Sequence, residues 1–517
     1  MPPRKQAVRP PTLGEVMRAR QAEMRARVDK LRNQYIEPIL ARFPGMLPTK
    51  PDSAAKYAMV SSTIWFAVGL MLALVIAIKL VFPGFASEIS FLSYGRLAAA
   101  ETAVMTWGVL FMGSVAAMFA VVPRVSGRKL WSERIGAQTV ILHNQVVLAG
   151  VVLLLLGRNQ GISGLELPWP IDLLLLNVML MVAQNVVATV ARRTEKRLAV
   201  PLWYYLAAIV VLPLTYGFGN LAAPYYFGVD QQIVAGFAIA GMGAGLVLMG
   251  IGTAYYVLPR ATGLPIYSDR LAIIGFWSFV FAAPWVGQVW SVFGPGPDHL
   301  ETVAITFSGW LIIPALCVFS NFWGTMKGAW AKVFEEPSVR FVLGGTVFLA
   351  FGSLLLAFGS LRTVQNVVGF TTWEMATQTA IAGGLGMILV GLVYHLFPRI
   401  IGRALYSAGW AARQFWFTTV GLATVVVSMA VAGLIQGYLQ IAAVQTEQPI
   451  STGEGWHAIA LAVRPLFILR IAGGTLVALG LFVFIRNLVN TVVNGRDIEI
   501  ELPVAAEPEP EPVGASA

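Results

Sequence analysis

Long runs of apolar residues, separated by short polar stretches, recur from Ala58 to Val489. A helix needs about 20 mostly apolar residues to cross the hydrocarbon core of a membrane, and the runs meet that length. Transmembrane β-strands would give short alternating segments instead. The pattern therefore predicts an all-α, polytopic membrane bundle of 12 transmembrane helices, near residues 57–83, 98–123, 134–157, 169–192, 201–222, 231–259, 270–295, 302–326, 340–362, 373–398, 413–440 and 464–490.

Basic residues gather in every second loop between the apolar runs. Four such loops are those near residues 124–134, 192–197, 327–340 and 399–413. The loops between them are poor in Lys and Arg and carry most of their charge as Asp and Glu. Because loops rich in Lys and Arg remain in the cytoplasm, we predict a multi-pass protein with both termini cytoplasmic.

The two ends of the chain differ in charge. Residues 1–56 form a basic tail, in which a helix from Thr12 would carry an apolar stripe of Met17, Met24, Val28, Leu31 and Tyr35. Two interpretations of this helix remain open, which are binding to membrane lipid and docking of a partner subunit. Residues 491–517 are acidic and rich in proline, and we predict that they form a disordered cytoplasmic tail. Residues 57–490 form the membrane domain between them.

Composition supports this interpretation. Of the 517 residues, 57% are hydrophobic and 12% are charged, whereas soluble domains have about 25% charged residues. The formal net charge is +10, but no nucleic-acid-binding motif accompanies it, so we expect no nucleic-acid partner. The single cysteine, Cys317, lies in an apolar run, which excludes an intrachain disulfide framework and a Cys-x-x-Cys-His haem attachment site.

Several segments, spread over roughly residues 55–490, resemble the catalytic subunit of the cbb3-type haem–copper oxidases. The most specific is Pro265-Ile-Tyr-Ser-Asp-Arg-Leu-Ala-Ile-Ile-Gly-Phe-Trp277. The others, in family order, begin at Ser93, Leu165, Leu202, Ala254, Gly328, Val393, Leu434 and Leu469. The resemblance implies a bundle of 12 helices in the bacterial cytoplasmic membrane, two haems and one copper ion on buried histidines, and partner subunits that include a membrane-anchored c-type cytochrome.

The resemblance also implies where those histidines would stand, and this chain has other residues there. Glu101 occupies the position of the low-spin haem ligand in the second span, and Ala376 and Gln378 occupy the two haem-ligand positions of the tenth. The copper-ligand positions are Ile239, Val289 and Trp290. Ala283 occupies the position of the family's cross-linked tyrosine, and Leu355 that of its buried glutamate.

Copper binds imidazole nitrogen strongly, and haem iron needs a donor such as His, Met, Cys or Tyr. We therefore expect no haem and no copper. The preferred hypothesis is a structural or regulatory subunit of a respiratory membrane complex with a degenerate active site. Two alternatives remain open. One is a working terminal oxidase or nitric-oxide-reductase-like subunit with unusual haem ligands, and the other is a proton conduit that uses Glu101, Tyr267 and Ser268.

The remaining polar residues carry smaller expectations. We expect His143 and His395 to be structural, and we place His299 and His457 in outer loops where they could share a surface metal ion. Glu101 would be neutral or would pair with an arginine such as Arg96 or Arg362, because an ionisable group in a span is costly. Met105 could offer sulfur to a haem. We expect the volume of the lost cofactors to be filled by side chains such as Trp290, Phe281 and Met387, and four glycines to allow close helix contact, namely Gly236, Gly241, Gly243 and Gly245.

Overall fold

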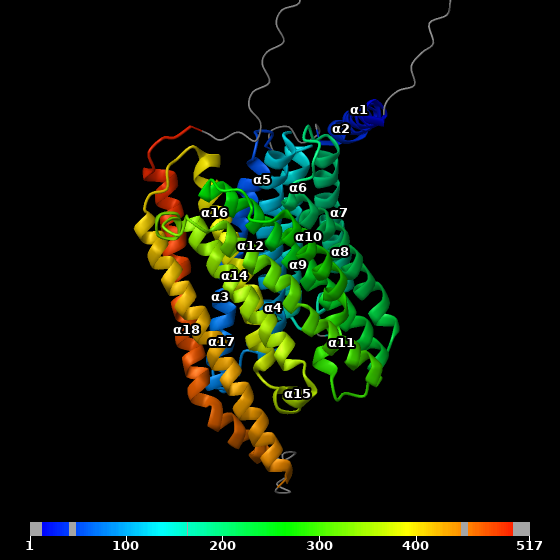
Figure 1. Cartoon of the computed structure of the whole chain (residues 1–517). Coiled ribbons are helices and arrows are strands. Elements are labelled where there is room, and N and C mark those ends of the chain that lie inside the picture. The colour runs from blue at the N-terminus through cyan, green and yellow to red at the C-terminus, as the bar shows by residue number, and fades with distance from the viewer. Residues whose placement is uncertain (1–12, 41–47, 163, 446–452, 500–517) are drawn as a thin grey trace, which may run out of the picture.

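The computed structural model describes residues 13–40, 48–162, 164–445 and 453–499, and these residues form 12 helices that are long and apolar enough to cross a membrane (Figure 1). The predicted all-α bundle of 12 spans is confirmed. The spans are Ser53–Val81 (α3), Tyr94–Ser126 (α4, η3 and α5), Glu133–Leu155 (α6), Trp169–Ala191 (α7), Val200–Tyr225 (α8 and η4), Gly228–Thr262 (α9), Asp269–Ser291 (α10 and η5), Asp298–Thr325 (α11 and α12), Pro337–Gly359 (α14), Trp373–Ile401 (α16), Ala408–Gln445 (α17) and Gly453–Asn494 (α18). Shorter helices are Ser90–Leu92 (η2), Lys332–Glu335 (α13) and Arg362–Val368 (α15).

Two spans change helix type near residues singled out by the sequence. The second is α-helical over Tyr94–Ala103 (α4), π-helical over Val104–Phe111 (η3) and α-helical again over Met112–Ser126 (α5). The seventh is α-helical over Asp269–Ala282 (α10) and becomes a 3₁₀-helix over Ala283–Ser291 (η5), where Pro284 supplies no backbone N–H. Both π-helical turns and long 3₁₀ segments are uncommon and often lie at functional positions.

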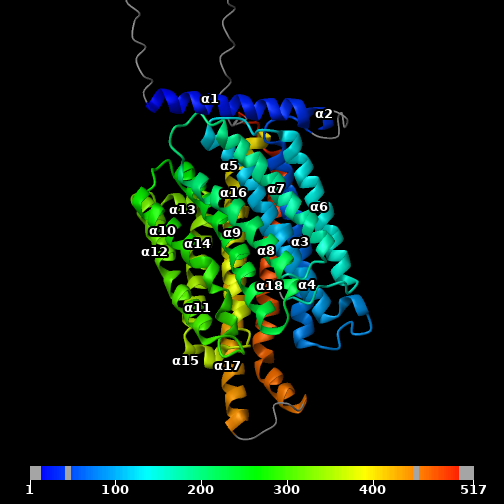
Figure 2. The same cartoon turned by 90° about the vertical axis from the view of Figure 1, so that its right-hand side faces the viewer.

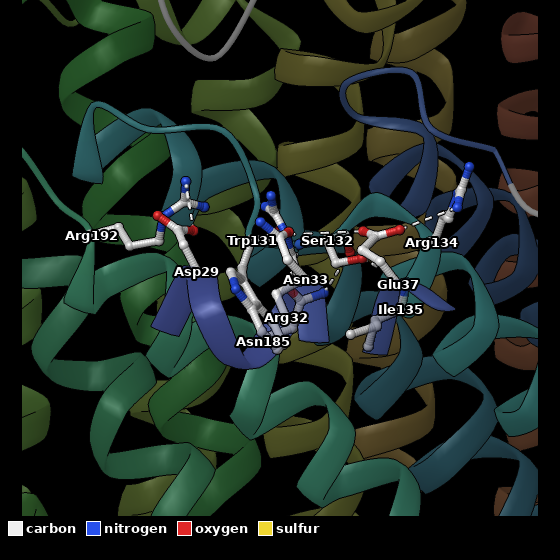
Figure 3. Close-up of polar contacts among 10 residues, drawn as sticks. All are labelled: Asp29, Arg32, Asn33, Glu37, Trp131, Ser132, Arg134, Ile135, Asn185 and Arg192. Atoms are coloured by element: carbon white, nitrogen blue, oxygen red, sulfur yellow. Dashed lines mark hydrogen bonds and ion pairs between the residues drawn. The ribbon is translucent and has the colours of Figure 1, made fainter. Parts of the chain in front are cut away.

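The N-terminal helix lies across one end of the bundle, roughly perpendicular to the spans (Figure 2). It comprises Leu13–Leu31 (α1), Arg32–Ile36 (η1) and Glu37–Leu40 (α2). Figure 3 shows how its polar face is attached: Asp29 pairs with Arg192 at 3.2 Å, Glu37 pairs with Arg134 at 3.2 Å, and the Arg32 guanidinium donates to the Trp131 carbonyl oxygen at 3.2 Å. The predicted helix is confirmed, and the structure fixes which face meets the bundle.

The predicted apolar stripe of this helix is divided between two environments. Val28 packs, together with Ile36, against buried Trp131 and Ile135 of the bundle. The rest of the stripe stays exposed on the flank of the helix, with exposed fractions of 63% for Met17, 52% for Met24, 48% for Leu31 and 58% for Tyr35. This exposed flank is what a membrane surface or a partner subunit would contact.

The C-terminal end is more ordered than we predicted. Helix α18 continues to Asn494, and Asp497 then pairs with Arg403 at 3.2 Å while the Ile498 amide donates to the Gly402 carbonyl oxygen. Disorder was therefore wrong for residues 491–499, because this stretch is held to the turn after α16. Residues 500–517 lie outside the described residues. At the other boundary, the first span begins at Ser53, a few residues earlier than predicted.

Glycines let the spans of the core approach closely. A Cβ atom at Gly245 would lie 2.8 Å from Cβ of Leu212, and one at Gly241 would overlap Thr215, so both glycines pack against α8. Gly236 faces η5 in the same way. Close helix contact is confirmed at these three positions, whereas Gly243 has no neighbour within 4 Å and lies on an exposed face.

Candidate functional site

A cavity of about 330 Å³ lies inside the bundle, between α3, the second span, α16, α17 and α18. Its walls are mostly apolar, because each of these helices turns Leu, Val, Ala or Met side chains toward it. Four strongly polar side chains interrupt these walls: Glu101 from α4, Gln378 from α16, Gln414 from α17 and Arg470 from α18. A concave, mostly apolar site with a few polar groups is the usual form of a small-molecule site.

Glu101 and Arg470 face this cavity without touching each other. Glu101 has no hydrogen bond to any described residue and no ion pair within 4.0 Å, although the two opposite charges attract across the cavity. Nη1 of Arg470 is buried and has no hydrogen-bond partner. Two charged groups are therefore exposed to the same internal space with their hydrogen-bonding capacity unused.

The predicted pairing of Glu101 with Arg96 or Arg362 is wrong. Arg96 donates to the Leu155 carbonyl oxygen at 3.4 Å and packs on Gly157. Nη2 of Arg362 lies 3.6 Å from Oε2 of Glu301. Each is used elsewhere, so Arg470 from the last span is the basic residue that shares the cavity with Glu101.

The two positions singled out in the tenth span lie on different faces of α16. Gln378 lines the cavity, and its Nε2 donates to Glu374 Oε1 at 2.9 Å. Ala376 has no exposed surface and packs in a second apolar cluster, with Trp373 and Ala380. The structure therefore brings Gln378 together with Glu101 and keeps Ala376 apart from them.

Our expectation that side chains fill the interior holds only in part. Met387 is 2% exposed and lines the cavity, and Trp290 packs partly buried between two apolar clusters. The prediction that Phe281 fills the interior is wrong, because Phe281 is 56% exposed and contacts Phe307 on the outer surface. The cavity next to Glu101 remains open.

Around η5 the interior is filled with hydrocarbon. Val289 has no exposed surface and packs with Ala283, Ala282, Ala304 and Ala244. Leu355 is 8% exposed and lies in the neighbouring cluster. No member of this hydrophobic set offers a side-chain lone pair to a metal ion.

Helix α9 approaches η5 so closely that no side chain fits between them. A Cβ at Gly287 would overlap the Gly236 carbonyl oxygen, and one at Gly236 would overlap the Gln288 amide. Gln288 Nε2 in turn donates to the Ile233 carbonyl oxygen at 2.9 Å. Ile239, on the same helix, does not join them: it is 37% exposed and contacts Gly164. The structure thus places Ile239 partly at the surface, beside Gly164, whereas Val289 is buried.

Tyr267 and Ser268 stand at the start of α10, and neither lines the cavity with Glu101. The Ser268 hydroxyl caps α10 by accepting from the Leu271 amide at 3.3 Å, and the Ser268 amide donates to Asn321 Oδ1 at 3.0 Å. The Tyr267 side chain is 61% exposed and lies over Gly324. Both contacts are those of a helix N-terminus fixed to its neighbour.

The histidines have packing roles where their contacts are described. His143 is 1% exposed, and its Nε2 lies 3.0 Å from the Trp107 carbonyl oxygen. His395 is buried, with Nδ1 2.8 Å from Arg399 Nη1. The structural interpretation of both is confirmed. His299 and His457 lie in α11 and α18 rather than in loops, and no group of three or more His, Cys, Asp or Glu that could hold a metal forms in the described part of the chain.

Twelve spans around a buried, mostly apolar cavity define a polytopic helical membrane protein. The family described as "Cytochrome C and Quinol oxidase polypeptide I" matches residues 53–476, and the chain belongs to this haem–copper oxidase subunit I family. The match begins at the first residue of α3 and ends within α18, so it covers the first 11 spans and part of the twelfth.

Bacterial relatives align over most of the chain. A "Cytochrome c oxidase subunit 1" of Rhodobacter capsulatus is 28% identical over 85% of this chain and 85% of its own length. The "Cbb3-type cytochrome c oxidase subunit CcoN1" of Stutzerimonas stutzeri is 27% identical over 86% of this chain and 95% of its own. Among solved structures, a heme-copper terminal oxidase dimer studied by cryo-EM matches with a TM-score of 0.70 at 15% identity, over 88% of this chain and 87% of that one, which shows a shared fold.

The side chains present do not fit the haems and copper that this family normally binds. The described residues that line the cavity include a carboxylate, amides, a guanidinium and thioethers, but no imidazole, thiolate or phenolate. Met105, the thioether beside Glu101, has its sulfur 2.6 Å from where a Cβ of Gly69 would lie, and so packs against α3. The hydrophobic side chains that pack with Val289 offer no donor, and the adjacent Gln288 amide is bonded to the Ile233 carbonyl oxygen. A sequence comparison of ligand positions identifies these differences, but the cavity itself emerges only from the packing of the spans.

Proposed function

We propose that this chain is a ligand-deficient homologue of the cbb3-type oxidase subunit and serves as a structural or regulatory subunit of a respiratory membrane complex. It is not catalytic by itself and carries neither haem nor copper. It resides in the bacterial cytoplasmic membrane, with the basic loops and both termini on the cytoplasmic side. Its partners are membrane lipid and other subunits of the complex, including a membrane-anchored c-type cytochrome.

One observation carries this proposal. Glu101 and Gln378, two of the residues that replace family haem ligands, line a single cavity with Arg470, and no imidazole lines it among the described residues. Haem iron held from both faces needs a donor of the right kind on each side. A carboxylate and an amide on facing helices do not provide this, so the scaffold is present without the ligands.

The region around η5 supports the same conclusion for copper. Direct backbone contact between Gly236 and Gly287 occupies the space between the sixth and seventh spans. Val289 is sealed among alanines, and Cu ions bind nitrogen and sulfur ligands rather than hydrocarbon. Substitution of one copper ligand alone would leave the other ligands in place. Here the hydrophobic side chains that pack with Val289 offer no ligand either.

The names of the relatives support the respiratory assignment. The aligned proteins of Stutzerimonas stutzeri and Rhodobacter capsulatus are oxidase subunits by name, and the alignments leave little of either chain unmatched. The shared fold supports assembly with neighbouring subunits, even though the chain's own chemistry is lost. Function nevertheless depends on the site, and the site here argues against oxygen chemistry.

Haem and metal analysis of the purified full-length protein tests the proposal. We expect no Soret absorption, no pyridine haemochrome and no copper above background, together with co-purification of a c-type cytochrome after mild solubilisation. Haem at a stoichiometry close to one per chain would overturn the proposal in favour of an oxidase with unusual ligands. Isolation of the protein free of any cytochrome partner, in several mild detergents, would argue against the respiratory complex.

A further inference from the structure

The cavity between the second span and α16 to α18 has unused binding capacity. Burying a charged group without a hydrogen-bonding partner is costly, and Glu101 and Arg470 both face this cavity without one. Both groups nevertheless line this cavity in the folded bundle of 12 spans. A molecule that hydrogen-bonds to both of them would remove that cost.

The charges at the cavity select the head group of such a molecule. An anionic head that reached Arg470 would also face Glu101, and a cationic head at Glu101 would face Arg470. The pair carries no net charge, so a neutral head is favoured. That head needs an O–H or N–H for the Glu101 carboxylate and an oxygen atom for the Arg470 guanidinium, and the Gln378 amide can serve either.

The walls select the body of the molecule. Apart from its few polar groups the cavity is lined by aliphatic side chains and thioethers, such as Leu74, Val390 and Met387. Gly386 also lines it, and a Cβ built there meets nothing within 4 Å, so space remains at the wall. A volume of about 330 Å³ lies within the range of sites for small ligands. These walls suit a hydrocarbon chain.

We propose that this cavity binds one neutral amphiphile, with a hydrogen-bonding head between Glu101 and Arg470 and a hydrocarbon body along α16. Two membrane sources have this chemistry, namely prenylated quinols, whose hydroxyls both donate and accept, and neutral glycerides. The inference rests on the proposed function in one respect, which is that haem does not occupy the same space.

The test uses the full chain purified in detergent and analysed by native mass spectrometry, first as isolated and then after titration with four probes: decylubiquinol kept reduced, monoolein, oleate and dodecylamine. We expect one bound molecule per chain for decylubiquinol, monoolein or both, and weaker binding of the anionic and cationic probes. The stronger neutral probe identifies the source. Preference for oleate or dodecylamine, or binding of none of the four, would overturn the inference.

Matched glycine variants locate the binding site. Gly386→Leu places a side chain in the cavity, whereas Gly243→Leu adds the same side chain on an exposed face of α9, where it also meets nothing within 4 Å. We expect Gly386→Leu to weaken neutral-probe binding about tenfold or more and Gly243→Leu to leave it unchanged. Equal effects of the two variants, or none, would place the bound molecule outside the cavity and contradict the inference.

The polar pair is tested by a charge-balanced double variant, Glu101→Leu with Arg470→Leu. Losing the hydrogen bonds to the head should weaken binding about tenfold or more, while the net charge of the cavity stays the same. If Gly386→Leu fails to fold, this variant and the wild-type titration still decide the question. A Soret band in the wild-type protein would refute the proposed function, whereas absence of both haem and bound amphiphile would refute only this inference.

Discussion

Arg124 binds Asp52 through two parallel hydrogen bonds, from Nη1 to Oδ1 at 2.8 Å and from Nη2 to Oδ2 at 3.0 Å. Both side chains are only 4% exposed. Arg124 lies near the end of α5, and Asp52 immediately precedes α3 with a left-handed backbone at φ 60°. The pair therefore fixes the start of the first span to the end of the second, beneath the N-terminal helix.

We predict that Asp52→Asn destabilises the protein by about 3 kcal/mol, because it removes the carboxylate charge that the buried Arg124 guanidinium binds through two hydrogen bonds. Asparagine tolerates the left-handed backbone, so the effect reports the charge rather than strain. The measurement is the thermal unfolding midpoint in detergent. The control is Glu335→Gln, which removes an exposed ion pair with Lys332 and should cost less than about 1 kcal/mol. Equal midpoint shifts in the two variants would contradict the prediction.

The attachment of α1 to the bundle should depend on salt. The pairs Asp29–Arg192 and Glu37–Arg134, drawn in Figure 3, are both partly exposed. Each such pair contributes up to about 1 kcal/mol, so Asp29→Asn with Glu37→Gln should raise amide exchange in α1 by roughly fivefold. High salt should also raise amide exchange in α1 of the wild-type protein, because it screens these ion pairs. Hydrogen exchange of the α1 amides is the measurement. Glu23→Gln, on the exposed side of the same helix, is the control and should leave the exchange rate unchanged.

Hydrophobic patterning predicted the 12 spans because only a membrane allows so many long apolar helices. It could not separate residues that face lipid from those that face the interior, since both are apolar. Phe281 and Ile239 illustrate this. Phe281 was predicted to fill the interior and Ile239 to stand at a copper-ligand position, yet the two residues are 56% and 37% exposed.

The candidate site was predictable only in its separate parts. Glu101 and Gln378 were singled out by position, but their meeting in one cavity depends on how α4 packs against α16. Arg470 was missed as the partner of Glu101, because it lies near the other end of the chain and no periodicity links residues on different spans. The available signal was that the last span contains arginines, Arg470 among them, because a charged group within a span is costly.

Glu166 should make stability depend on pH. It lies in the loop between α6 and α7, where the Gly164 amide donates to its Oε1 at 2.9 Å, and burial raises the pKa of its carboxyl above the usual range. The folded protein therefore binds this proton more tightly than the unfolded chain, whose carboxyl titrates near pH 4.3. Its contribution to stability is greatest at low pH and falls as the pH rises from about 4 through the raised pKa.

Replacing this carboxyl by a neutral amide removes that dependence. Glu166→Gln keeps an oxygen for the Gly164 amide, so we expect it to raise the unfolding midpoint at pH 8 and to have little effect at pH 4. Midpoints of wild type and variant across this range provide the measurement. Glu88→Gln, in an exposed loop, is the control and should show no such trend. A gain from Glu166→Gln that is larger at pH 4 would show that the sign is wrong.

Two histidines should restore a haem site if the cavity lies where the family holds its low-spin haem. Glu101 and Gln378 line the cavity from α4 and α16, so Glu101→His with Gln378→His places an imidazole on each side of it. We predict about one low-spin haem per chain in this double variant when it is produced with haem supplied, because two imidazoles form a strong axial pair. The spectrum should show a Soret band that the wild type lacks.

The control for this restoration is Glu101→His with Ala376→His. Ala376 lies on the other face of α16, with no exposed surface, so its imidazole cannot share the cavity with position 101. We expect this control to bind far less haem than the first pair. Equal binding by both pairs would indicate adventitious haem. A folded Glu101→His, Gln378→His protein without a Soret band would show that this cavity does not correspond to a haem position, and the structural basis for ligand loss at Glu101 would fail.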